Sequence, residues 1–246
     1  PMAVLVNRLS ASASEIFAGA IQDYDRGLVL GSQTFGKGTV QTLIPLNRGQ
    51  LKITQAKFYR ISGQSTQHQG VIPDIEFPEL YDVERIGESS LDDALPWDVI
   101  QPAIFERYDT SLDPMIADLR ERHEQRTASD PDFDYLRSLS AKSDENRART
   151  HISLSEKRRL EEKAEDDDWR LKLENTLRLA KGEALYKTLD EFEELTKAEA
   201  DAKEKEDEQE PAEKDAMLRE SGNILIDLIT ARRQVAAVEL GNSEES

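Results

Sequence analysis

The sequence predicts an α/β layer followed by a mainly α-helical region, and three observations support this fold class. Residues 1–80 alternate strand and helix signals at the spacing of an α/β fold. Residues 81–246 instead repeat leucine and isoleucine at helical spacing. The charge changes at the same boundary, because residues 1–80 carry +1 (seven Lys and Arg against six Asp and Glu) and residues 81–246 carry −19. We therefore predict two domains, 1–80 and 81–246.

The first domain is expected to begin with a buried strand at Ala3–Val6, an unbroken apolar run. A helix should follow and stop near Gly27. A second short buried strand is predicted at 28–30. Two further strands at 39–44 and 51–59 should be joined by a polar turn, and 70–75 reads as an extended edge. The helix is predicted from apolar residues that share one face: Ile16, Phe17, Ala20, Ile21 and Tyr24.

The second domain shows three apolar periodicities. One predicts a helix around 112–119, a second predicts one longer helix over 169–195, and a third predicts a last helix around 224–229. Residues 199–215 hold nine acids and three lysines, which indicates a solvated helix surface or a mobile linker. The run 166–168 is three aspartates, and neighbouring helical aspartates point in different directions, so we expect charge display rather than cation binding.

Composition excludes several functions. The chain has no cysteine, which rules out disulfides, thiolate metal sites and a cysteine nucleophile. Its net charge of −18 argues against nucleic-acid binding. No apolar run approaches the roughly 20 residues of a membrane helix. The three histidines form no metal motif and are expected at surface or half-buried positions, so no metal or cofactor is predicted. The opening at Pro1, with no leader visible, indicates a piece of a longer protein.

The stretch 31–38 resembles a phosphate-binding loop without completing it. Gly31, Gly36 and Lys37 fit the pattern G-x-x-x-x-G-K-[ST], but Gly38 stands where the motif needs a hydroxyl. A β-branched run follows, which favours a strand over the helix that such a loop needs. The glycines could equally shape a turn between two strands, and the stretch by itself leaves the role of Lys37 open.

Ser12 lies at a predicted strand-to-helix turn, where a serine is well placed for nucleophilic attack. The same serine with Glu15 also fits a capping box that would only start the helix. A nucleophilic serine needs a base, and no histidine is suitably placed in the sequence. Lys37 remains, because a Ser-Lys pair is an alternative to Ser-His-Asp.

Two motifs together resemble a known family. The segments 7–16 (NRLSASASEI) and 35–41 (FGKGTVQ) are similar to the carboxyl-terminal processing peptidases, and the closest branch looks like the tail-specific proteases of the bacterial periplasm. Further matches fall within 57–75. Direct similarity covers residues 1–80, and the long acidic helical extension is a feature of the same branch.

The resemblance implies a fold and a set of site residues. The fold would be the C-terminal part of the α/β serine protease core shared with the crotonase and Clp-protease superfamily. Ser12 would be the nucleophile, Lys37 the general base and Gln41 the residue that orients the lysine, while the backbone N–H of Ala13 would donate to the oxyanion. Spacing does not separate Ser12 from its serine neighbours; the family motif does.

A lysine base also needs a suitable setting. Free lysine has a pKa of about 10.4 and is protonated at neutral pH, so it accepts a proton only in a desolvating site. Phe35 and Val40 are expected to supply apolar surroundings. Gln41 stands four residues after Lys37, and on an ideal strand the two side chains would face the same way.

The resemblance also implies a serine endopeptidase, without cofactor or metal, that cleaves proteins near their C-termini. Its partners would be protein substrates with accessible, apolar C-termini and a helical adaptor lipoprotein, in the bacterial periplasm and with peripheral association with the cell envelope. The family's PDZ domain, N-terminal helical domain and second oxyanion donor have no counterpart in these residues, so this fragment alone is expected to be inactive. The alternative is a non-catalytic fragment that docks the adaptor.

Overall fold

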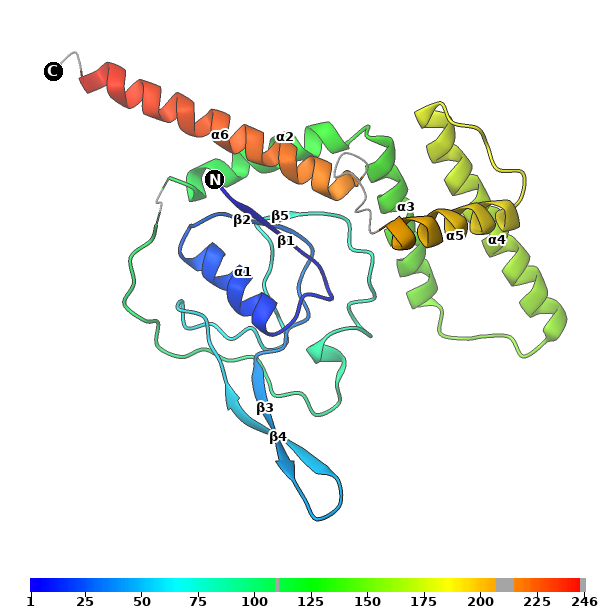
Figure 1. The fold of residues 1–246 in the computed structure, drawn as a ribbon, viewed down its shortest axis with the longest axis horizontal. Helices are drawn as coiled ribbons and strands as arrows, with labels where there is room; N and C mark the ends of the chain where they lie inside the picture. The colour runs from blue at the N-terminus through cyan, green and yellow to red at the C-terminus, as the bar shows by residue number, and fades with distance from the viewer. Residues whose placement is uncertain (109–110, 207–214, 244–246) are drawn as a thin grey trace. The chain divides into compact units, whose positions relative to one another are not determined.

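The computed structural model describes the backbone of residues 1–108, 111–206 and 215–243, and the side chains of 1–108, 111–198 and 215–235. Its elements are, in chain order, β1 (Ala3–Val6), α1 (Ala13–Asp23), β2 (Leu28–Gly31), β3 (Thr39–Pro45), β4 (Gln50–Lys57), β5 (Ile75–Glu76), the short 3₁₀ helix η1 (Glu88–Ser90), α2 (Asp113–Thr127), α3 (Pro131–Ala148), α4 (Glu156–Lys181), α5 (Leu189–Glu206) and α6 (Ala216–Ser243) (Figure 1). The predicted class, an α/β region followed by helices, is confirmed.

The chain forms two compact units. Unit 1 comprises residues 1–123 and 220–246, and unit 2 comprises residues 124–219. Residues 81–123 and the greater part of α6, which the charge pattern assigns to the helical domain, therefore belong to the same compact unit as residues 1–80.

A small parallel sheet forms the centre of unit 1. Its strand order is β1-β2-β5, so β2 is flanked on both sides and all four of its residues are buried. Helix α1 packs on the sheet through Ala18, which joins Val6, Val29 and Val71 in one core cluster. The bounds predicted for the strand Ala3–Val6 are correct, but the strand is only partly buried. It is an edge strand, and Leu5 is 37% exposed.

Strands β3 and β4 form an antiparallel hairpin that extends away from the sheet and α1 (Figure 1). The predicted turn is present at Gly49, which adopts φ 82°. A bulge falls between Val40 and Gln41, so the strand is not regular at that point. Nearly every residue of the hairpin is exposed, including apolar ones such as Leu43 and Ile53. In the described part of the chain this hairpin therefore has little packing of its own.

The helical region departs from the prediction in two ways. The single long helix expected over 169–195 is wrong: α4 ends where Gly182 takes the left-handed conformation (φ 71°), and α5 begins only at Leu189. Helix α3 was missed because its mean hydropathy is low and its helical start is set by polar groups. Asp130 caps it by accepting hydrogen bonds from the next two free backbone N–H groups, after Pro131 at its first position.

Three smaller findings concern charged residues. His123 was expected at or near the surface but is 5% exposed, pairs with Glu220 (Nδ1 to Oε1, 3.0 Å) and stacks on Phe77. Two of the aspartates of 166–168 form ion pairs, Asp166 with Lys142 (3.2 Å) and Asp168 with Lys172 (2.6 Å). The acidic segment 199–215 is helical up to residue 206, and 207–214 lie outside the described residues.

No helix in the described part of the chain is long and apolar enough to cross a bilayer.

Candidate active site

Ser12 occupies a strained turn at the start of α1. Its backbone has φ 56° and ψ −110°, a conformation that costs a residue with a side chain on the order of 1–3 kcal/mol. Among the described non-glycine residues, only Asp25 and His68 share a positive φ with it. Strain of this kind is typical of turns that project a nucleophile at a strand-to-helix junction. This feature distinguishes Ser12 from Ser10 and Ser14, which the sequence alone did not.

Glu15 is the structural centre of this turn. Its side chain is completely buried and accepts a hydrogen bond from the Ser12 backbone N–H (Oε2, 2.7 Å), as the capping-box hypothesis requires. Its other oxygen, Oε1, accepts from the Thr34 hydroxyl and from the Gly36 N–H, each at 2.6 Å. Burial raises the pKa of Glu15, and the hydrogen bonds that it accepts oppose that rise. A carboxylate can accept all of these bonds at once, since every partner donates.

The loop between β2 and β3, here called the Lys37 loop, contacts this same carboxylate, as does the turn before α1 that holds Ser12, here called the serine turn. Oε2 of Glu15 accepts from the Lys37 backbone N–H (2.9 Å) as well as from that of Ser12. The two backbone nitrogens therefore lie no farther apart than two hydrogen bonds placed end to end. Phe35 adds a second tie, because its N–H donates to the carbonyl of Ser10 (2.9 Å). The structure thus brings together the two motifs that the sequence analysis singled out.

The glycines around Lys37 serve close packing. Gly36 has φ 91°, and a Cβ there would lie 2.6 Å from the His68 carbonyl oxygen. A Cβ on Gly38 would lie 2.8 Å from the backbone nitrogen of Gln67. Both positions need glycine for steric reasons. The loop then enters β3 rather than a helix, so the phosphate-loop hypothesis lacks the helix N-terminus on which it depends.

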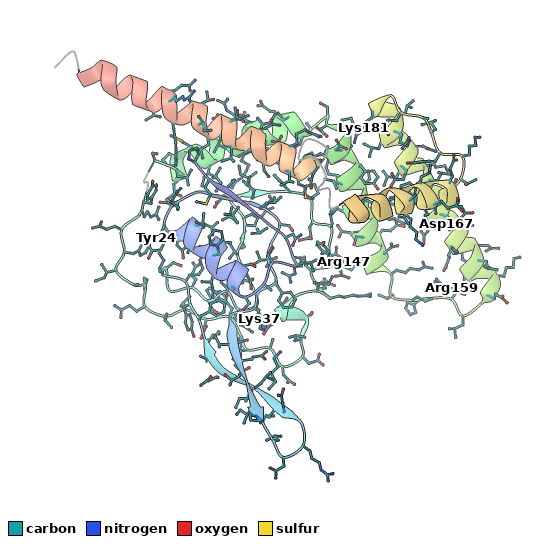
Figure 2. All side chains as sticks on the ribbon, in the orientation of Figure 1. Tyr24, Lys37, Arg147, Arg159, Asp167 and Lys181 are labelled. Atoms are coloured by element: carbon teal, nitrogen blue, oxygen red, sulfur yellow. The ribbon has the colours of Figure 1, made fainter. Side chains whose placement is uncertain are left out.

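The Lys37 side chain lies at the base of the β3–β4 hairpin and is half-buried (Figure 2). Its amine makes no hydrogen bond or ion pair with any residue that the structure describes. The setting expected from the sequence is only partly present. Val40 is 46% exposed, and the Gln41 amide reaches Thr54 Oγ1 (3.5 Å) instead of the lysine. Lys37 precedes the strand, and the bulge before Gln41 breaks the alternation that was expected to align the two side chains.

Ala13 is the first residue of α1, and its backbone N–H donates to no residue in the described part of the chain. It is one of the free N–H groups of a helix N-terminus, where the helix dipole favours negative charge. The geometry is compatible with the predicted oxyanion donor. No cluster of metal-ligating residues is found among the described residues.

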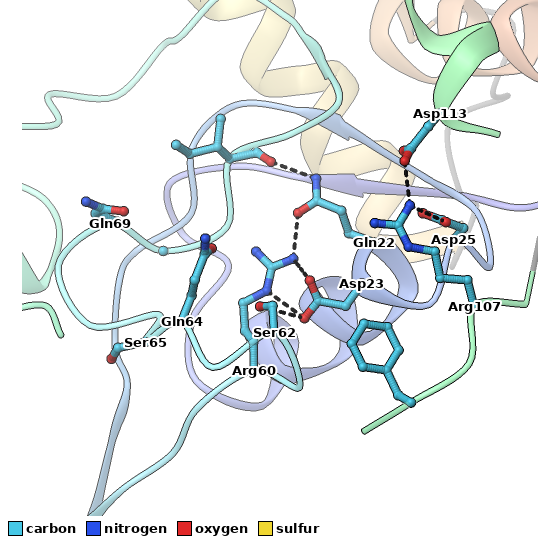
Figure 3. Close-up of a pocket in the computed structure, with 13 residues that line it drawn as sticks. Gln22, Asp23, Asp25, Arg60, Ser62, Gln64, Ser65, Gln69, Arg107 and Asp113 are labelled. Atoms are coloured by element: carbon cyan, nitrogen blue, oxygen red, sulfur yellow. Dashed lines mark hydrogen bonds and ion pairs between the residues drawn. The ribbon is translucent and has the colours of Figure 1, made fainter. Parts of the chain in front are cut away.

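Two pockets lie near α1. One, of about 90 Å³, is lined mostly by apolar side chains, including Ile16, which lies one helical turn after Ser12. Asp23 and Arg60 also line it, as does Thr66, whose buried hydroxyl has no hydrogen-bond partner among the described residues. The other is polar, about 340 Å³, and lies at the C-terminal end of α1 (Figure 3). Its two arginines are already neutralised: Arg60 pairs with Asp23, and Arg107 pairs with two aspartates. The polar pocket therefore offers no free cation to an anionic ligand.

Two family models match the chain. One, described as peptidase family S41, matches residues 1–77, so the part that holds the serine turn and the lysine loop is of a peptidase class. The other, described as the C-terminal domain of tail specific protease, matches residues 81–230, more than half of the chain. The chain therefore belongs to the tail-specific branch of the carboxyl-terminal processing peptidases.

Similar proteins carry matching names. The chain is 42% identical over 200 residues to the tail-specific protease of Haemophilus influenzae, an alignment that covers 77% of this chain and 29% of that protein. It is 52% identical over 99 residues to a carboxy-terminal-processing protease of Bartonella bacilliformis, covering 37% and 23%. A solved structure, the photosystem II D1 C-terminal processing protease, is 44% identical over 34% of this chain and 22% of that one, with a TM-score of 0.31. The chain spans less than a third of each of these relatives.

Proposed function

We propose that the chain carries the catalytic Ser12 and Lys37 of a serine endopeptidase that cleaves proteins near their C-termini. The observation that carries the proposal is that one oxygen of Glu15, Oε2, accepts hydrogen bonds from the backbone N–H groups of both Ser12 and Lys37. A buried carboxylate bound to both segments fixes their backbones relative to each other, which a Ser-Lys pair requires. The backbone strain at Ser12 supports the same assignment.

In the proposed reaction, the neutral amine of Lys37 takes the proton from Ser12 Oγ as that oxygen attacks the scissile carbonyl carbon. The carbonyl oxygen becomes an oxyanion that accepts a hydrogen bond from the N–H of Ala13. The lysine then gives its proton to the leaving amine, the peptide C–N bond breaks and an ester to Ser12 remains. Water, deprotonated by Lys37, attacks the ester carbonyl carbon; the bond to Ser12 Oγ then breaks, Oγ takes the proton back from Lys37, and the new carboxyl terminus is released. Gln41 is proposed to orient the amine of Lys37 after its side chain leaves Thr54 and turns toward the lysine.

The small pocket that Ile16 lines, one helical turn after Ser12, supports the proposed substrate class. It places Ile16 and Phe58 around a space of about 90 Å³, which suits a small apolar side chain. By family resemblance we further propose protein substrates with accessible, apolar C-termini, a helical adaptor lipoprotein as partner, and a periplasmic location with peripheral attachment to the cell envelope. No metal or cofactor takes part in the proposed reaction.

The test is casein turnover by the natural full-length polypeptide that carries this chain. Ser12→Ala should abolish hydrolysis, and Lys37→Arg should do no better than Lys37→Ala, because a guanidinium cannot be deprotonated in a protein. Ser14→Ala is the matched control and should keep full turnover, since Ser14 is exposed on α1. Substantial turnover by Lys37→Arg would mean that the lysine acts as a positive charge and not as a base.

The second candidate is a non-catalytic docking module whose acidic helices bind an adaptor. It is favoured by the many exposed apolar side chains of the helical region, such as Leu154 and Leu179. The same assay separates the two candidates: if the chain is only a docking module, Ser12→Ala leaves casein turnover unchanged.

A further inference from the structure

A segment after β5 braces the Lys37 loop. The backbone N–H of Glu88, the first residue of η1, donates to the Phe35 carbonyl (2.9 Å). Arg8, 1% exposed, fixes the same segment by donating to the Ile86 carbonyl (2.5 Å) and also to the Thr34 carbonyl (2.7 Å). The Lys37 loop and the segment around η1 are thus tied to each other on the N-terminal side of Lys37.

Gln67 extends this brace to the other side of Lys37. Its side chain is completely buried, its Oε1 accepts from the Gly38 N–H (2.9 Å), and its Nε2 donates to Glu88 Oε1 (3.1 Å). The neighbouring His68 N–H donates to the Gly36 carbonyl (2.9 Å). Both peptide groups that flank Lys37 are therefore held by residues 67 and 68.

Glu88 determines which way the Gln67 amide points. In the observed orientation a donor faces the carboxylate and an acceptor faces the Gly38 N–H. Turning the amide over would place oxygen against oxygen at Glu88 and hydrogen against hydrogen at Gly38. Both contacts would then be repulsive, and buried polar groups left without partners are costly.

We propose that Gln67 and Glu88 are positioning residues for Lys37: the carboxylate fixes the amide, and the amide fixes the peptide group from which the lysine side chain departs. This inference rests on the proposed role of Lys37 as the base. Glu88 lies within the region matched by the tail-specific C-terminal domain, whereas Lys37 lies within the region matched by the peptidase family. The extension of this branch therefore contributes to the active site itself, in addition to any docking role.

The test compares variants of the natural full-length polypeptide by kcat, KM and urea unfolding. Glu88→Ala and Gln67→Leu should lower kcat by up to roughly 100-fold, the effect of a displacement of about 1 Å in a catalytic group, while KM stays unchanged. Glu88→Gln keeps an acceptor oxygen and should retain most of the turnover. Glu84→Ala, an exposed glutamate in the same segment, is the matched control and should behave as the wild type.

An exchange of the two side chains gives the sharper result. Gln67→Glu alone places two carboxylates together and should be strongly impaired. Adding Glu88→Gln restores both contacts, because the new glutamate accepts from Gly38 and from the new amide, so kcat should recover. A merely space-filling role predicts no such recovery. An exchange variant no better than Gln67→Glu alone, or a folded Glu88→Ala with wild-type kcat, would overturn the proposal.

The outcome for Lys37→Ala separates this inference from the proposed function. Turnover that survives Lys37→Ala overturns the base assignment, and the positioning role falls with it. Turnover that is lost in Lys37→Ala but kept in both Glu88→Ala and Gln67→Leu overturns the positioning role alone.

Discussion

Replacing Glu15 should damage unit 1 more than any change of similar size on its surface. Hydrogen bonds to a charged group contribute about 1.5–3 kcal/mol each, and Glu15 accepts four of them while fully buried. These contributions do not add, and burial of the charge, which raises the pKa of Glu15, offsets part of them. We expect Glu15→Ala to lower the free energy of unfolding of unit 1 by about 3–5 kcal/mol.

Glu15→Gln should cost less, for a reason that depends on the geometry. If the amide nitrogen replaces Oε2, it opposes the N–H groups of both Ser12 and Lys37. If it replaces Oε1, it opposes only the Gly36 N–H, because the Thr34 hydroxyl can turn and accept. The second orientation should prevail, leaving one backbone donor without a partner at a cost of about 1–3 kcal/mol.

The assay is urea denaturation of the chain followed by the fluorescence of Trp97, in a Trp169→Phe background so that the signal reports unit 1. Trp97 suits this purpose because its indole N–H donates to the Ser65 carbonyl (2.9 Å). Glu76→Gln, an exposed glutamate on β5, is the control and should change stability by less than about 0.5 kcal/mol. A Glu15→Ala variant within that same margin, or a Glu15→Gln variant less stable than Glu15→Ala, would refute the reasoning.

Two further predictions concern other elements. Burial raises the pKa of Asp74, so its contribution to stability is fully present below the ordinary value of about 3.9 and is lost as pH rises through the raised value. In urea titrations from pH 4 upward, the free energy of unfolding of the wild type minus that of Asp74→Asn should therefore fall with rising pH, and a difference that stays constant or rises would contradict this. Gly182→Ala should destabilise unit 2 by about 1–2 kcal/mol, because φ is 71° and no atom lies within 4 Å of the new Cβ, which leaves backbone strain as the only cost. Gly222→Ala, equally open but inside α6, should raise the stability of unit 1 by about 0.5–1 kcal/mol, and equal effects of the two changes would show that φ is not the cause.

Local patterns predicted the elements whose signal lies in adjacent residues. The bounds of Ala3–Val6 and the hairpin were correct to within two residues because runs of apolar and β-branched residues specify strands directly. The break at Gly182 was missed because the leucine spacing continues across it, and one glycine inside an otherwise helical pattern does not by itself stop a helix. Helix α3 was missed because its start depends on a polar cap at Asp130 and not on an apolar face.

The candidate site likewise contains features that local sequence patterns predict and contacts that they do not. The pair Ser12 and Glu15 could be identified as a capping box, since Glu15 stands three positions after Ser12. The bonds from Glu15 to Thr34, Gly36 and Lys37 join segments 19 to 22 residues apart, and nothing in the local sequence indicates them. Gln67 lies within the stretch 57–75 that resembles the family, but the resemblance gave it no role, and a glutamine is most often exposed. The roles of Ser12, Lys37, Gln41 and the Ala13 N–H stay predictions.

The order of the two units along the chain has a consequence for biosynthesis. Unit 2 is inserted into unit 1, whose two segments are residues 1–123 and 220–246. A chain that leaves the ribosome from its N-terminus therefore exposes the whole of unit 2 before the part of α6 that belongs to unit 1 is available. The contact between His123 and Glu220 can form only after Glu220, which lies 97 residues further on, has been synthesised. The bonds that join the serine turn to the lysine loop need only residues up to 37, so this part of the site can form early in synthesis, while the helix that completes unit 1 arrives last.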